Sequence, residues 1–173
     1  MRTLCLLLPI LSLAGSAAPA WATVIGGPFI GEGIEIVPST EVQQQLDRQM
    51  TAGTDSVFLV ADVHAGKDEM HGFAEHAFIP YLSISYSLTK DGTPTFKKVG
   101  LLYPVAAKGG PHYAGSAEMA GAGTYHLTYI ISPPNSHGML RQTSKEEGVP
   151  DWWKPITASW NFAYPGSNTS SAK

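Results

Sequence analysis

Cysteine is almost absent from this chain, which has one, Cys5, in 173 residues. It lies in an N-terminal segment that combines Arg2, an apolar run from Leu4 to Ala14, and the small-residue ending Ala20-Trp21-Ala22. These are the marks of a cleaved secretory signal peptide, with Thr23 as the first mature residue. The exported protein is therefore expected to have no thiol, which excludes disulfides, thiolate nucleophiles, cysteine metal sites and an acylated cysteine anchor.

Long apolar runs and an excess of positive charge are also missing. The run Leu4 to Ala14 is shorter than the roughly 18 residues that span a bilayer, so we expect the product not to be membrane-anchored. The chain has 14 acidic against 11 basic residues, and a net negative charge without a basic stripe argues against nucleic acid as a partner. We predict a periplasmic protein.

The remaining length is typical of one domain with an adequate core. We predict a signal peptide at 1–22, a single β-sandwich domain at 23–166 and a flexible polar tail at 167–173.

Most of the sequence after residue 22 shows short segments in which apolar and polar residues alternate, as they do in β-strands. In 82–88 the apolar residues Leu82, Ile84, Tyr86 and Leu88 alternate with serines, and Asp91-Gly92 then supplies a hairpin turn. Similar patterns predict further strands at 33–37 as an edge, and at 56–64, 96–103, 125–131 and 156–164. Segment 41–50 is either helical, turn-like or an extension of the edge strand. Short strands punctuated by turns predict an all-β fold, an immunoglobulin-like antiparallel β-sandwich.

No constellation for catalysis is found. The sequence has no G-x-S-x-G elbow, and the serines of 83–87 follow strand alternation instead. We therefore predict that the protein is not an enzyme.

Several segments resemble a known family. They are VFLVADVHA at 57–65, IPYLSISYSL at 79–88, GGPHYAG at 109–115, GTYHLTY at 123–129 and WWKP at 152–155. In order and spacing they are similar to the periplasmic proteins associated with bacterial Fe2+/Pb2+ permeases, over about Ile34 to Tyr164. The resemblance implies an immunoglobulin-like sandwich, a homodimer and a role beside an inner-membrane iron permease.

The resemblance also implies a copper site, but most of its ligand positions are apolar here. Phe58 and Val60 stand where the family has a His and a Glu, Val105 stands for a Met, and Ile130 for a second His. Only His112 is retained. Copper in such a site needs several converging imidazole and thioether donors, so we predict that the pocket is repacked with apolar side chains.

Other donors remain that a rebuilt site can use. The loop from His64 to His76 contains three histidines, including His71, together with acidic residues and Met70. Asp62 and His64 lie on the strand face of Phe58 and Val60, and both can meet a third group. The candidate metal residues are thus His112, His71, His76 and His64, for a divalent copper or iron ion if any cofactor is bound. Structural roles for these histidines are the alternative.

Two functions follow as hypotheses. The first is a periplasmic accessory or binding protein of a bacterial iron or divalent-metal transport system, with a degenerate or altered metal site. The second is a non-metal protein-interaction module of the same fold, with Trp152-Trp153 as core or as an interface anchor. An enzyme of metal redox chemistry would need the missing donors.

Overall fold

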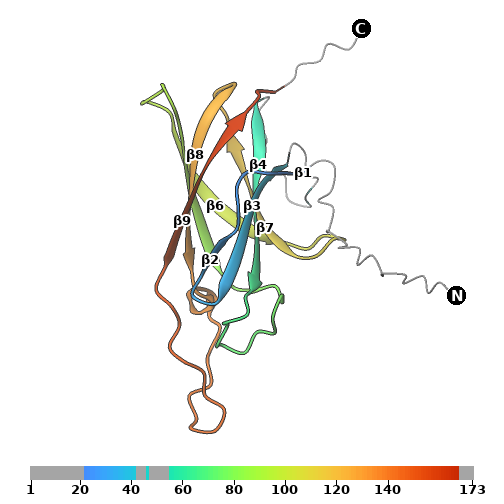
Figure 1. Ribbon diagram of the computed structural model, residues 1–173, viewed down its shortest axis with the longest axis vertical. Coiled ribbons are helices and arrows are strands. Elements are labelled where there is room, and N and C mark those ends of the chain that lie inside the picture. Colours follow the sequence, from blue (N-terminus) through green and yellow to red (C-terminus); the bar gives the residue numbers. More distant parts are fainter. Residues whose placement is uncertain (1–21, 42–45, 47–54, 168–173) are drawn as a thin grey trace, which may run out of the picture.

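The computed structural model describes residues 22–41, 46 and 55–167. Within them the chain forms one sheet of nine strands, all paired antiparallel, in the order β1-β3-β4-β7-β6-β5-β8-β9, with β2 also paired to β3 (Figure 1). The strands are β1 (Ala22–Val24), β2 (Phe29–Gly31), β3 (Ile34–Glu41), β4 (Ser56–Ala65), β5 (Ser83–Lys90), β6 (Lys97–Val105), β7 (His112–Glu118), β8 (Gly123–Ser132) and β9 (Ile156–Tyr164), and one short 3-10 helix, η1 (Pro134–His137), follows β8. The predicted all-β, antiparallel class is confirmed.

Alternation explains where the strands form and which side of each is buried. In β8, the side chains of Tyr125, Leu127, Tyr129 and Ile131 are all fully buried, as expected when every second residue faces one side of a sheet. Strand β7 was not predicted because its small central residues weaken the apolar pattern. Strand β3 is not the predicted edge, since β1 and β2 cover its free side. Most of segment 41–50 lies outside the described residues.

Strand β6 connects the two halves of the sheet. Its first part pairs with β5, and its last residues, Tyr103 to Val105, pair with β7. The hydroxyl of Tyr129 in one half donates a hydrogen bond to the carbonyl of Val60 in the other, at 3.3 Å, and Tyr86 donates to Ser116 at 2.8 Å. The sheet therefore curls so that its halves face each other across the core.

The switch of β6 between partners requires a close approach of backbones. A Cβ atom at Gly115 of β7 would lie 2.3 Å from the carbonyl oxygen of Leu101 in β6. Real Cβ atoms never come so close to a carbonyl, so only glycine fits at this crossing.

The loops that follow β4 and β8 extend from the same end of the molecule (Figure 1). The β8–β9 connection, drawn in orange, reaches furthest beyond the strands, and the green β4–β5 loop lies beside its base. The histidine-rich loop contacts the β8–β9 connection, because the ring of His71 lies against Trp152 and Trp153.

Candidate metal-binding face

The outer face of β4 carries an apolar pair followed by a polar pair. Val57, Leu59, Ala61, Val63 and Ala65 point into the main core, so Phe58, Val60, Asp62 and His64 point outward. Phe58 and Val60 are nevertheless only 3% and 5% exposed, although neither belongs to the main core cluster. The prediction that these two positions pack as buried apolar residues is confirmed.

The neighbouring strands extend this outer face. Val60 pairs with Ala114 of β7, and Val105 of β6 pairs with His112. Three of the positions that the resemblance assigns to copper ligands, 58, 60 and 105, thus share one face with His112. None of the three side chains has a lone-pair donor, so the residues present do not fit copper at this place.

Ile130 lies elsewhere. It belongs to β8 in the other half of the sheet, pairs with Ser85 of β5 and Thr157 of β9, and is 46% exposed. A single chain therefore does not bring the fourth vacated position to His112.

Next to this apolar area, the outer face carries four polar residues from β3, β4 and β7, which are Glu35, Asp62, His64 and His112. The Nδ1 atom of His64 is 3.5 Å from the carboxylate of Asp62. Glu35 of β3 is directly opposite His64 in the strand register. The pairing of Ala61 with Tyr113 places the next residue, Asp62, alongside His112.

The other three residues all affect the charge state of Asp62. Partial burial raises the pKa of its carboxyl above the ordinary value, and the negative charge of Glu35 adds to the rise. The charges of His64 and His112 act in the opposite direction. From the sequence, a third group is expected near Asp62 and His64. The structure places two there, Glu35 and His112.

Sequence reasoning missed Glu35. In the sequence, Glu35 is only an acidic residue between two apolar ones, Ile34 and Ile36, which are fully buried. Its position beside His64 becomes visible only once β3 is known to pair with β4. Among the residues that the structure describes, no three His, Cys, Asp or Glu side chains are already arranged to hold a metal ion.

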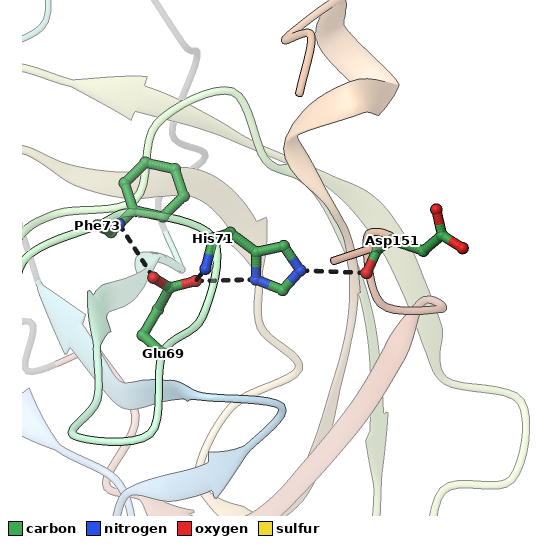
Figure 2. Close-up of polar contacts among 4 residues, drawn as sticks. All are labelled: Glu69, His71, Phe73 and Asp151. Atoms are coloured by element: carbon green, nitrogen blue, oxygen red, sulfur yellow. Dashed lines mark hydrogen bonds and ion pairs between the residues drawn. The ribbon is translucent and has the colours of Figure 1, made fainter. Parts of the chain in front are cut away.

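The histidines of the β4–β5 loop were the second set of candidate metal ligands. In the structure, one of them, His71, makes hydrogen bonds within the protein instead. Figure 2 shows the carboxylate of Glu69 receiving hydrogen bonds from the backbone N–H groups of His71 and Phe73, at 2.6 and 3.0 Å. The Nδ1 atom of His71 lies 2.9 Å from the same carboxylate, and its Nε2 donates to the carbonyl of Asp151 at 3.1 Å. Both ring nitrogens are engaged, so His71 would have to break a contact to bind a metal.

Two tryptophans complete the surroundings of this histidine. The ring of His71 stacks on Trp152 at 4.9 Å between centroids and meets Trp153 edge-on at 5.2 Å. Trp153 is buried, with 6% exposure. Trp153 therefore packs inside the chain and Trp152 is partly buried, and their contacts with His71 hold the β8–β9 connection against the β4–β5 loop.

His76, in the same loop, is free of such packing. Its side chain is 80% exposed and lies 3.8 Å from the carboxylate of Glu75. The structure thus separates the four predicted histidines: His64 and His112 lie on one face, His71 is enclosed between loops, and His76 is on the surface.

Comparison with known proteins places this curled antiparallel sheet among proteins of iron transport. This chain belongs to the Fe2+ transport protein family, whose model matches residues 25–166. The predicted resemblance is confirmed.

Individual relatives agree with this assignment. A UPF0423 protein of Brucella abortus is 37% identical over 177 residues, covering 99% of this chain and 97% of that protein. The FetP protein of uropathogenic Escherichia coli strain F11 superposes with a TM-score of 0.80 at 35% identity, covering 87% of this chain and 100% of that one. Copper-reconstituted P19 of Campylobacter jejuni gives 0.79 at 32% identity, covering 86% and 99%.

The 34 kDa membrane antigen of Treponema pallidum is a more partial match, 33% identical over 61% of this chain and 54% of that protein. In the part of this chain that the structure describes, no helix is long and apolar enough to cross a bilayer.

Proposed function

We propose that this chain is a periplasmic accessory or binding protein of a bacterial iron or divalent-metal transport system, and that its metal site is altered. The observation that carries the proposal is the outer face of β4, where buried Phe58 and Val60 replace the family's donors while Asp62 and His64 remain beside them. Family membership supports the transport role. The signal-like segment 1–21, which lies outside the described residues, supports export.

The proposed partner is an inner-membrane iron permease, with no enzymatic step of the chain's own. Copper-bound structures of FetP and P19 support a metal-binding rather than a catalytic role for this fold. We also propose one domain over 23–166 of immunoglobulin-like form, because the hydroxyl of Tyr129 bridges the facing halves of the sheet. Residues 168–173 of the predicted tail lie outside the described residues.

A homodimer is part of the proposal. Val99, Leu101 and Tyr103 of β6 are 68%, 50% and 49% exposed, and Ile130 of β8 is 46% exposed. Leu101 of β6 and Ile130 of β8 both pair with Ser85 of β5, from its two sides. We name these four residues the outer apolar band, and we propose that a second copy covers it.

The alternative function, a non-metal protein-interaction module, is favoured by the same band, since exposed contiguous apolar residues mark interaction surfaces. The two functions differ in whether the purified protein carries and binds a metal. Stoichiometric metal in protein taken from its own periplasm would exclude the alternative.

Titration calorimetry of the mature protein with Cu(II), Fe(II) and Mn(II) tests the altered site. We expect copper to bind weakly, and we expect the triple variant Phe58→His, Val60→Glu, Val105→Met to bind it at least about 100-fold more tightly, because it restores lone-pair donors. Sub-micromolar copper binding by the unchanged protein that His112→Ala abolishes would overturn the claim. Iron uptake by cells that lack this protein tests the transport role.

A further inference from the structure

We propose that Trp160 of β9 and the segment Gly26-Gly27, between β1 and β2, form a latch that joins the two outer edges of the sheet and keeps second copies of the chain from adding a strand to β9. Among the described residues, β9 pairs only with β8, whereas β1 and β2 both pair only with β3. The sheet therefore ends at β9 on one side and at β1 and β2 on the other. The latch is separate from the proposed function, because it concerns the assembly of the chain and not what the chain binds.

The composition of β9 makes it a strand that another chain can extend. Its nine residues, ITASWNFAY, include no charged residue, no proline and no glycine. An outermost strand presents unpaired backbone N–H and C=O groups, and proteins protect such strands with lysine, proline or a bulge. A segment rich in β-branched and aromatic residues that lacks these protective features is typical of strands that stack between chains. The edge of β9 therefore needs protection from elsewhere in the fold.

The opposite edge of the sheet is interrupted by a bulge. The pairing of β1 with β3 ends at Val24 and Ser39, and the pairing of β2 begins at Phe29 and Ile36. Four residues of this edge, 25–28, thus lie opposite only two residues of β3. Surplus residues of this kind leave the ladder and bend the strand. The last of the four is a proline, which has no N–H group with which to pair a further strand, so this edge is protected by its own residues.

The bulge contacts β9 through the side chain of Trp160. The indole Nε1 of Trp160 donates a hydrogen bond to the carbonyl oxygen of Gly27 at 2.9 Å. A Cβ atom at Gly26 would lie 2.4 Å from Cδ1 of the same indole, so the ring lies directly against the backbone of the bulge. Position 26 requires glycine because of this close approach. One side chain thus joins the two outer edges of the sheet.

The core holds the indole of Trp160 in this position. Its ring meets the fully buried Tyr129 edge-on, at 5.5 Å between centroids. Ala158 and Phe162, its neighbours on the same face of β9, are both buried. Because the ring is fixed by these contacts, its hydrogen bond to Gly27 restrains β9 itself. The latch therefore keeps the outer edge of β9 turned toward the other half of the sheet and away from a second copy.

The test compares two neighbouring glycines in the mature protein. Gly26→Ala places a methyl group against the indole, whereas an added Cβ atom at Gly27 has no atom within 4 Å, so Gly27→Ala is the matched control. Trp160→Phe removes the N–H donor and keeps an aromatic ring, and it carries the test if Gly26→Ala does not fold. We expect Gly26→Ala and Trp160→Phe to raise amide hydrogen exchange in β9 at least about 10-fold and to form larger assemblies in light scattering. Gly27→Ala should behave as the unchanged protein does.

All proteins in this test also carry Leu101→Glu, so that association through the outer apolar band does not contribute. Ser159→Lys adds a lysine on the exposed face of β9, and it should return Trp160→Phe to the size of the parent protein, because an edge lysine opposes strand addition. Circular dichroism checks folding. Folded Gly26→Ala and Trp160→Phe proteins with the exchange rates and size of the parent would overturn the latch, as would assemblies that Ser159→Lys does not suppress.

Discussion

The carboxylate of Glu69 lies 2.9 Å from the ring Nδ1 of His71, and both side chains are nearly fully buried, at 2% and 6% exposure. The pair connects two loops that are distant in sequence, because the other ring nitrogen bonds to the carbonyl of Asp151. Because this pair is buried, breaking it should lower the free energy of unfolding more than breaking a pair on the surface does.

Replacing Glu69 by Gln should lower the free energy of unfolding by about 3 kcal/mol, because a buried partner is left uncompensated. Urea unfolding followed by tryptophan fluorescence measures the loss. Glu75→Gln is the control, since Glu75 and His76 form an exposed pair at 3.8 Å, and such pairs contribute about 0–1 kcal/mol. Equal losses in the two variants would contradict the assignment.

His126 should make stability depend on pH. Hydrogen bonds to the carboxylate of Asp91 and to Asn161 raise its pKa above the ordinary 6.5. A raised pKa in the folded state stabilises the protein fully below the unfolded pKa, and this contribution disappears as pH rises through the folded pKa.

Thermal unfolding of the unchanged protein and of His126→Gln, at about pH 5.5 and about pH 9, checks this expectation. The variant should be less stable at the lower pH, and the difference should shrink at the higher pH. A stability difference between the two proteins that grows with pH would contradict a raised pKa of His126 in the folded state.

The outer apolar band should control self-association. Leu101→Glu and Ile130→Glu each place a charge in the proposed interface, and a buried unpaired charge is costly, so we expect monomers in light scattering at micromolar concentration. Leu140→Glu is the control, because Leu140 is 89% exposed in the β8–β9 connection and outside the band. A monomeric unchanged protein, or dimers of all three variants, would argue against this interface.

Gly115 should be intolerant of any side chain. Gly115→Ala puts a Cβ atom 2.3 Å from the Leu101 carbonyl, and forcing the strands apart should cost about 1–3 kcal/mol. Gly109→Ala, with no atom within 4 Å of the added carbon, should be neutral or slightly stabilising. Urea midpoints of the two variants give the comparison.

Much of the fold was predictable because strand alternation is a local property. The strand containing Leu82 to Leu88 and the strand containing Tyr125 to Ile131 were both read from which residues alternate, and their buried faces agree. The β7 strand was missed because Ala114, Gly115 and Ser116 give no apolar alternation. The candidate site was predictable only in part, since His64 and His112 were named but Glu35 was not.

The sequence by itself determined which positions lack metal donors, because a side chain such as Phe58 or Val60 has no lone pair in any fold. It also determined the family, several of the longer strands and the absence of cysteine from everything after residue 5. Only the tertiary structure decided which donors meet. Strand pairing joins residues far apart in the chain, and it placed Glu35 opposite His64 while it moved Ile130 to the other half of the sheet.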